Sequence, residues 1–206
     1  MKTINFTFTK LGRALLLSAV MAVCLVGCGG SSSSSLNDSR DGQKYRTVKI
    51  GNQVWMAENL RFKIGDSWCY ENSEDNCKKY GRLYDWNMAK IACPKGWHLP
   101  SDDEWEELIT VVGSSEAGKK LKSKNGWNGN AEGTNVFGFS SLPGGYRTSK
   151  GAFDKIGFGG LWWTASDDDS YYSYGIECRI MESNYNGVKS LKFNESSGAS
   201  VRCVAD

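Results

Sequence analysis

The side chains with the clearest capacity for chemistry are seven cysteines and a single histidine, His98. A nucleophilic serine or cysteine triad needs an imidazole as its general base, so His98 would have to serve any such site. It lies in a Trp-His-Leu-Pro segment just before a helix signal, which favours a structural ring that donates to backbone. We therefore expect no catalytic residues and no enzyme activity.

Three consecutive aspartates, Asp167, Asp168 and Asp169, form the only other candidate for a chemical site. Clustered carboxylate oxygens are the ligands that calcium prefers. An acidic run in a turn is more often simply solvated, however, so we expect no metal ion and no cofactor. The three aspartates remain candidates for calcium.

The first 27 residues have the pattern of a secretory signal peptide. Lys2, Lys10 and Arg13 precede an apolar run, residues 14–26, that is too short to span a bilayer of about 30 Å. The run leads into Leu-Val-Gly-Cys, which resembles the lipobox of bacterial lipoproteins, where Cys28 is acylated after cleavage. Glycine, not aspartate, follows this cysteine. The resemblance therefore implies a lipid anchor in the outer membrane, with the domain in the periplasm or on the outer face.

The charge of the chain argues against nucleic acid as a partner. Residues 1–27 contain three of the 25 basic residues and none of the 23 acidic ones, so the remaining chain has a formal net charge of −1. It offers no basic face for nucleic acid and no polybasic segment for lipid headgroups. The only membrane contact that we expect is the lipid anchor.

Five cysteines remain once the signal peptide has been removed and Cys28 has been acylated. They would lie in an oxidising compartment, so disulfide bonds are expected. Cys69 and Cys77 flank a short polar loop and suit a local bond. The sequence does not fix the pairing of the other three, and the odd count leaves one thiol unpaired.

A tether and one domain follow the anchor. Residues 28–44 are rich in Ser, Gly, Asn and Asp and have too few apolar side chains to fold, so we predict a flexible tether before a domain at 45–206. Short apolar runs on both sides of Gly51 and Asn52 predict a β-hairpin.

Two to three helices are expected in the first half of this domain. Ser101 and Glu104 have the spacing of a capping box, and apolar residues repeat at helical spacing from Trp105 onward. Residues 83–92 and 116–122 are the other helix candidates. From residue 139 onward, short alternating segments between turn residues predict strands. The expected fold class is α+β, with a mainly antiparallel, twisted sheet.

Aromatic side chains are frequent in the loops and strands of the second half. Flat aromatic faces can stack on sugar rings, while nearby amides and carboxylates bind the sugar hydroxyl groups. Trp127 has Asn and Gly neighbours and should be the most exposed, whereas Trp162 and Trp163 should alternate between a buried and an exposed face. The candidate ligand-binding residues are Trp127, Asn128, Tyr171, Tyr172, Tyr174 and Tyr185.

Six segments occur in an order that is typical of one known family. The segments are IGNQVWMAENL (50–60), YGRLYDWNMA (80–89), CPKGWHLPSDDEWEEL (93–108), LPGGYR (142–147), LWWTAS (161–166) and SVRCV (200–204). Together they resemble the Fibrobacter succinogenes major paralogous domain family, and they extend over nearly all of residues 45–206.

The order of four features is also similar to the plan of C-type-lectin-like domains. These features are a cysteine, a Gly-x-His-Leu-Pro-Ser segment, an acidic helix and a late cysteine. This resemblance implies that Cys93 bonds to Cys203. Cys178 is then expected to be a buried thiol, and the alternatives are a bond to a neighbour in the sheet or to another molecule. The segment HLPSDDEWEEL is also similar to formylglycine-generating enzymes, which would imply a copper oxidase with a close pair of late cysteines. Here the late cysteines, Cys178 and Cys203, are 25 residues apart, and Cys203 is needed for the disulfide. This departure argues against the oxidase.

The function that we expect is therefore that of an outer-membrane lipoprotein with a C-type-lectin-like, non-enzymatic binding or adhesion domain. The expected ligand is a polysaccharide or a cell-surface glycan. The alternatives are a formylglycine-generating-type oxidase and an envelope protein that binds another protein.

Overall fold

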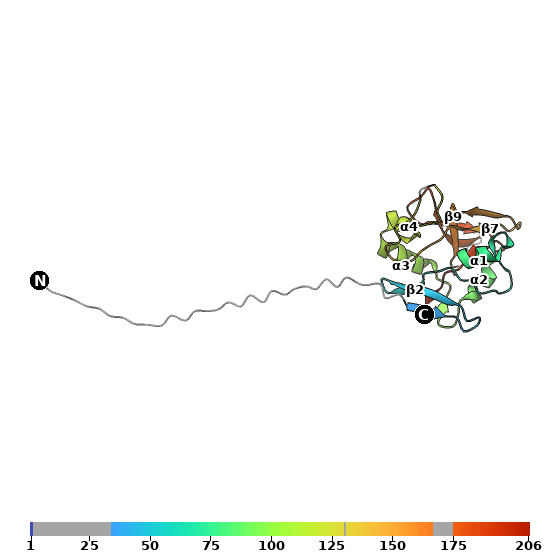
Figure 1. Cartoon of the computed structure of the whole chain (residues 1–206), viewed down its shortest axis with the longest axis horizontal. Coiled ribbons are helices and arrows are strands. Elements are labelled where there is room, and N and C mark those ends of the chain that lie inside the picture. The colour runs from blue at the N-terminus through green and yellow to red at the C-terminus, as the bar shows by residue number, and fades with distance from the viewer. Residues whose placement is uncertain (2–33, 130, 167–174) are drawn as a thin grey trace. The chain divides into compact units, whose positions relative to one another are not determined.

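The computed structural model describes Met1 and residues 34–129, 131–166 and 175–206 (Figure 1). The fold is α+β, with short helices and mostly antiparallel sheets. Cys28, Asp167, Asp168, Asp169 and the tyrosines at 171, 172 and 174 lie outside the described residues. No helix in the described part of the chain has the length and apolar character to span a membrane.

The first sheet contains both ends of the domain. Its strands are antiparallel, and β2 and β3 form the predicted hairpin, whose turn contains Gly51 at φ 60°. The short C-terminal strand inserts between β3 and β6, and Figure 1 shows the C-terminus beside β2. In spatial order the strands are β1 (Ser34–Asn37), β2 (Lys44–Ile50), β3 (Gln53–Met56), β13 (Val204–Ala205) and β6 (Trp97–His98).

The prediction of a flexible tether up to residue 44 was wrong for the described part of that segment. Strand β1 pairs with β2, and Asp38 in the following turn is buried. Arg40 pairs with Asp38 at 2.7 Å, donates to the carbonyl of Ala92 at 2.8 Å, and stacks over Phe62. The composition of this segment did not predict its order, because the segment is held mainly by contacts between polar groups and has no apolar stripe that a sequence pattern would reveal.

The second sheet forms the centre of the domain. Its order is β11-β10-β9-β12-β5-β4, and β7 joins β9 and pairs with β8. Only the β7–β9 and β9–β12 pairings are parallel. The strands are β4 (Ser67–Trp68), β5 (Leu83–Tyr84), β7 (Gly144–Arg147), β8 (Phe153–Ile156), β9 (Gly159–Trp163), β10 (Ile176–Glu182), β11 (Lys189–Phe193) and β12 (Ala199–Ser200).

The described residues form four α-helices, one more than the largest number expected. The unexpected helix is α1, which lies in the polar segment between Cys69 and Tyr80, and residues 83–84 form a strand before α2. Figure 1 shows α3 and α4 on one side of β9 and α1 and α2 on the other. The helices are η1 (Tyr70–Asn72), α1 (Glu74–Tyr80), α2 (Trp86–Ala92), α3 (Asp102–Val112), η2 (Ser114–Glu116) and α4 (Ala117–Leu121).

The capping box at the start of α3 is confirmed. Glu104 N–H donates to Ser101 Oγ at 3.2 Å, and Ser101 N–H donates to Glu104 Oε2 at 2.8 Å. Both bonds satisfy amide groups that have no partner inside the helix. The apolar face of the helix is buried, with Trp105 and Leu108 fully inaccessible.

Strand β9 separates two apolar clusters. Trp162 lies in the cluster that includes Trp105 and Phe139, whereas Trp163 lies in the cluster that includes Tyr84. The two rings therefore alternate as predicted, but both are fully buried, so the expectation that one would be exposed was wrong. Both faces of β9 are covered, and neither tryptophan is available to a ligand.

Two disulfide bonds join segments of the domain. Cys93 bonds to Cys203 across 110 residues, with a Cα–Cα distance of 5.9 Å, and Cys69 bonds to Cys77 across eight. Cys178 is a free, buried thiol. All three assignments made from the sequence are confirmed. The longer bond attaches the segment that leads into α3 to the end of the chain.

Candidate functional site

The side chain with the strongest sequence prediction for ligand contact, Trp127, is buried. Only 4% of its surface is exposed, and its indole N–H donates to the carbonyl of Ser141 at 3.2 Å. The ammonium group of Lys122 lies 4.7 Å from the centre of its ring. The prediction that Trp127 is an exposed stacking residue was wrong. Gly126 and Gly129 have φ angles of 97° and 76°, which let the loop turn and direct the indole inward.

Two of the other predicted residues are exposed. Tyr185 has 43% of its surface exposed, and Lys189 Nζ lies 4.7 Å from its ring centre. Asn128 is exposed, and its N–H donates to the carbonyl of Gly157 at 2.8 Å. This contact places Asn128 against the turn between β8 and β9. Tyr185 lies in the segment after β10, beside the residues that form the nearest cleft.

That cleft, which we name the Phe158 cleft, has a volume of about 530 Å³. It combines exposed aromatic surface with carboxylate, amide and hydroxyl groups. Phe158 is 52% exposed and brings an apolar aromatic surface to the cleft. The lining residues are Tyr70, Asp154, Lys155, Ile156, Phe158, Glu182, Ser183 and Asn184.

The position of Phe158 follows from the tight turn between β8 and β9. Lys155 and Gly157 have positive φ angles of 66° and 79°, and Phe158 N–H donates to the carbonyl of Lys155 at 2.9 Å. The φ of Gly157 favours glycine, and a Cβ there would also lie 2.5 Å from the side-chain amide nitrogen of Asn128, which would have to move. The carbonyl of Phe158 accepts from Ser183 N–H at 2.8 Å. The turn is thus attached to the end of β10 with its phenyl ring outward.

Hydrogen bonds also hold the two carboxylates of the cleft in place. Asp154 Oδ2 accepts from the hydroxyl of Tyr146 at 3.1 Å, and Glu182 Oε2 pairs with Lys189 Nζ at 2.7 Å. Burial, together with the hydrogen bond to Asp154, raises the pKa of Tyr146. These carboxylates can accept hydrogen bonds from a ligand without a large rearrangement.

A buried lysine supports the segment after β10. Lys122 Nζ donates to the carbonyls of Glu182 and Tyr185, and burial lowers the pKa of this lysine to about 8. Sequence reasoning missed Lys122 because lysine is rarely buried. Its two hydrogen bonds hold the backbone of the segment that contains Glu182, Asn184 and Tyr185.

His98 has a structural environment that differs from the predicted one. The ring contacts two carboxylates and not backbone: Nδ1 lies 2.7 Å from Asp206 Oδ1, and Nε2 lies 2.8 Å from Glu104 Oε1. Partial burial opposes the charged form, but the hydrogen bonds to Asp206 and Glu104 outweigh it and raise the pKa of His98. The ring links the start of α3 to the last residue of the chain.

The described residues contain one cluster with the composition of a metal site. Cys69, Glu74 and Cys77 lie together, but the two sulfur atoms are bonded to each other and therefore cannot act as thiolates. Cys203 is likewise in a disulfide bond. Burial, with a smaller contribution from Glu177, raises the pKa of the Cys178 thiol well above its usual value.

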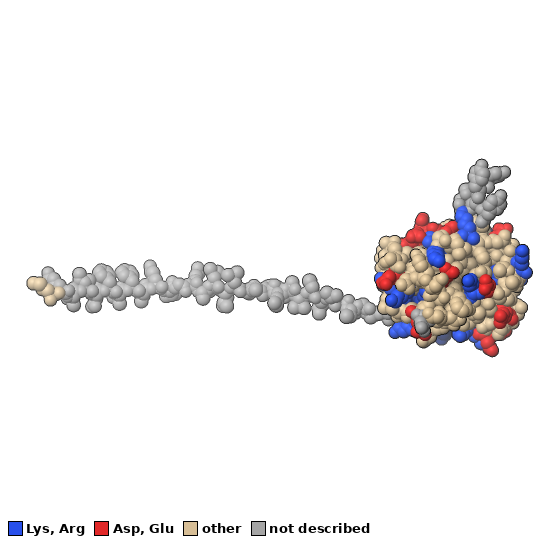
Figure 2. Space-filling view, turned by 90° about the horizontal axis from the view of Figure 1, so that it is seen from above, with Lys and Arg blue, Asp and Glu red and all other residues tan. Residues whose placement is uncertain are grey.

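Charge is mixed over the surface of the domain. On the face shown in Figure 2, basic and acidic residues are interspersed. This distribution resembles an ordinary solvated surface more than the basic face of a nucleic-acid-binding protein.

Comparison with known proteins gave one match. A family model described as the Fibrobacter succinogenes major domain matches residues 48–205. No curated protein and no solved structure matches the chain.

Proposed function

The chain belongs to the Fibrobacter succinogenes major domain family, and we propose that it is a lipid-anchored, non-enzymatic saccharide-binding protein of the outer membrane. The observation that carries this proposal is the Phe158 cleft. An exposed phenyl ring lies there beside the fixed carboxylates of Asp154 and Glu182 and the amide of Asn184. The ligand that we propose is a neutral polysaccharide or cell-surface glycan.

The chemistry of this cleft matches that of a sugar ring. The axial C–H groups of a pyranose form an apolar face that stacks on a phenyl ring, and its edge carries hydroxyl groups. Asp154 and Glu182 can accept hydrogen bonds from these hydroxyls, and Asn184 can donate and accept. An open cleft of this kind suits internal segments of a polymer, because both ends of the chain can extend into solvent.

We also propose a C-type-lectin-like fold. The first and last strands of the domain belong to one sheet, and the Cys93–Cys203 bond attaches the segment before α3 to the final strands. Both features agree with the resemblance in sequence. The proposed saccharide site differs from calcium-dependent lectin sites because it relies on an aromatic side chain and protein carboxylates.

The cysteines support a binding protein over an oxidase of the formylglycine-generating type. Such an oxidase would need two reactive late thiols that converge on copper. Cys203 is bonded to Cys93, and Cys178 is buried with a raised pKa. These features disfavour thiolate chemistry at either residue.

The lipid anchor is supported by the lipobox-like sequence that ends at Cys28. Strand β1 begins at Ser34, six positions later. Six residues extend over about 20 Å at most, so the domain would remain close to the membrane surface. Many copies on one membrane would bind a polymer with high avidity even if each site were weak.

A polysaccharide screen tests the proposal. The full-length protein, purified in detergent, is incubated with insoluble cellulose, xylan, chitin and mannan and is applied to a glycan array. We expect retention on at least one neutral saccharide and loss of that retention in Phe158→Ala. Binding to none of them, or binding that Phe158→Ala leaves unchanged, would contradict the proposal.

A further inference from the structure

A second cleft, with a volume of about 470 Å³, has a different chemistry. It lies between the segment after β3, the end of α1 and the loops that follow α4. It shares no lining residue with the Phe158 cleft. We name it the basic cleft because five basic side chains and one acidic side chain line it: Arg46, Arg61, Lys78, Lys79, Lys124 and Glu58.

The acidic side chain of the basic cleft is already neutralised. Glu58 pairs with Arg46 at 3.0 Å and with Arg61 at 2.8 Å, so one carboxylate serves two guanidinium groups. Burial disfavours the charged carboxylate, but the bonds from Arg61 and Arg46 outweigh burial and lower the pKa of Glu58. The glutamate therefore stays ionised, and the cleft keeps an excess of positive charge.

The lysines add to this excess. Lys78 pairs with Asp75 at 2.9 Å, but both side chains are highly exposed, so solvent screens the pair. Lys79 and Lys124 are exposed and have no carboxylate partner among the residues that the structure describes. Each can turn toward a ligand without breaking an ion pair.

A buried arginine lies directly behind the wall of the basic cleft. Arg202 is fully buried, and it donates to the side chain of Asn59 and to the carbonyls of Phe139 and Ser140. Its neutral partners Asn59 and Ser140 line the cleft. Within the described part of the chain, no carboxylate forms an ion pair with Arg202, and burial lowers the pKa of this group to about 9, against the opposing effect of the negative charge of Glu58.

A buried cation without a carboxylate in direct contact is costly, and an anion bound in the cleft would reduce that cost further than Glu58 alone does. The fold places the guanidinium of Arg202 behind Asn59 and Ser140, while the exposed lysines Lys79 and Lys124 line the cleft itself. Asn125, Asn135 and Ser123 also line the basic cleft and offer neutral polar groups. The basic cleft is therefore suited to an anion that is attached to a polar molecule.

We propose that the basic cleft binds an anionic group, a carboxylate or a phosphate, that is carried by a glycan. Arg46, Arg61 and the two unpaired lysines provide the charge, and the amides and hydroxyl groups contact the sugar to which the anion is attached. This site is independent of the Phe158 cleft.

Calorimetric titration of the full-length protein in detergent tests this site with matched probes. The probes are oligogalacturonate, its methyl ester, which has the same sugars without the charge, and mannose 6-phosphate with mannose as its neutral partner. We expect binding of oligogalacturonate, of mannose 6-phosphate or of both, with affinity that falls as salt rises. The charged probe that binds identifies the anion as carboxylate or phosphate.

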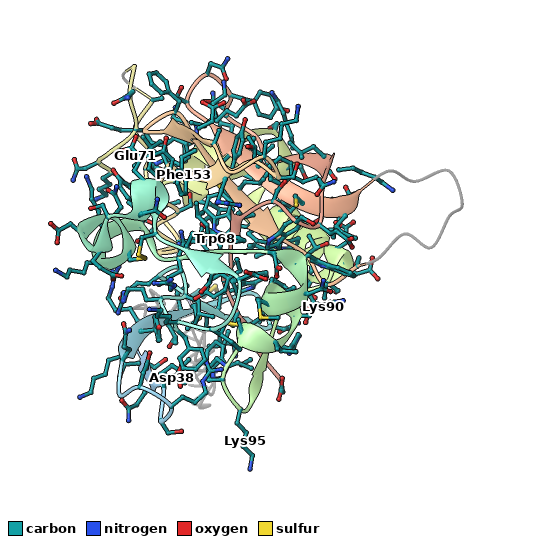
Figure 3. All side chains as sticks on the ribbon, turned by 90° about the vertical axis from the view of Figure 1, so that its right-hand side faces the viewer. Asp38, Trp68, Glu71, Lys90, Lys95 and Phe153 are labelled. Carbon is teal, nitrogen blue, oxygen red and sulfur yellow. A yellow bond between two sulfur atoms is a disulfide. The ribbon has the colours of Figure 1, made fainter. Side chains whose placement is uncertain are left out.

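Variants assign that binding to the basic cleft. We expect Lys79→Gln/Lys124→Gln to weaken it about tenfold or more, as removal of two charge-assisted contacts would. The matched control is Lys95→Gln/Lys150→Gln, which changes two exposed lysines outside the cleft and should leave affinity within about twofold. Figure 3 shows Lys95 directed into solvent.

Three results would overturn the proposal. They are no binding of either charged probe, equal binding of the charged and neutral partners, and equal losses in the two double variants. Phe158→Ala should leave anion binding unchanged, so failure at the basic cleft and failure of the neutral-saccharide site can be told apart.

Discussion

The side-chain oxygen of Asn59 accepts hydrogen bonds from Nε and Nη2 of Arg202 at 3.1 and 2.8 Å. The same oxygen accepts from the indole N–H of Trp162 at 3.0 Å, and the amide nitrogen donates to the carbonyl of Tyr80. One buried amide thus connects the last segment of the chain, the central strand β9 and the end of α1. It also forms part of the wall of the basic cleft.

Removal of this amide should destabilise the domain severely. Asn59→Ala leaves Nε of the buried Arg202 guanidinium and the buried indole N–H of Trp162 without an acceptor, so we expect a loss of about 3 kcal/mol or more in the free energy of unfolding. Urea denaturation measures the change. Asn125→Ala removes an exposed amide from the same cleft and should cost less than about 0.5 kcal/mol. Similar losses in the two variants would show that the Asn59 network contributes little.

The two disulfide bonds should differ in their contribution to stability. On the chain-entropy relation, the bond across 110 residues contributes about 5 kcal/mol and the bond across eight contributes about 2.5 kcal/mol. We compare Cys93→Ala/Cys203→Ala with Cys69→Ala/Cys77→Ala by denaturant unfolding. Each double variant removes one disulfide bond. Cys69→Ala/Cys77→Ala therefore controls for the loss of a disulfide as such, and the difference between the variants reports the length of the closed loop. A smaller effect at Cys93 and Cys203 would contradict this order.

Protonation of His98 should stabilise the fold. Both ring nitrogens face carboxylates, and only the imidazolium can donate to Glu104 and Asp206 at once. Its folded-state pKa is above the unfolded value of 6.5, so this stabilisation is complete below pH 6.5 and is lost as pH rises through the folded pKa. His98→Asn should remove that pH dependence in urea titrations.

The pKa itself can be measured directly. His98 is the only histidine in the chain, so its imidazole proton signals in an NMR titration need no assignment by mutation. A midpoint at or below 6.5 would show that partial burial outweighs the two carboxylates.

The free thiol should be unreactive in the folded protein. Cys178 is fully buried, and burial raises its pKa, so the thiolate that attacks a disulfide reagent is scarce. We expect Ellman's reagent to detect no thiol in the native protein at pH 8 and one thiol per chain after unfolding. Rapid reaction in the native state, or copper bound to the purified protein, would favour the oxidase alternative.

Local patterns in the sequence predicted the local structures well. The capping box of Ser101 and Glu104 and the hairpin at Gly51 use contacts between residues that are near each other in the chain. The Cys93–Cys203 bond came from family resemblance, since no local rule relates residues that are 110 positions apart. Helix α1 was missed because its polar sequence has no long apolar stripe.

The candidate sites were much harder to predict. Trp127 has the neighbours of a loop residue, yet its indole finds an acceptor at Ser141 and a cation at Lys122, and both partners depend on the tertiary fold. Phe158 looked like an ordinary strand residue, and its exposure follows from the turn at Gly157. Arg202 lies in a segment that marks the family, but its lack of a carboxylate partner within the described residues is visible only in three dimensions.

The comparison of Phe158→Ala with Ile91→Ala tests the central claim most directly. Ile91 is also an exposed apolar residue, with 60% of its surface accessible, but it lies on α2 and outside both clefts. Binding isotherms of the two full-length variants and the wild type are measured on whichever of cellulose, xylan, chitin or mannan retains the protein. We predict that Phe158→Ala weakens binding about tenfold and that Ile91→Ala stays within about twofold of the wild type. Equal affinities for the three proteins would contradict the assignment of the saccharide site to the Phe158 cleft.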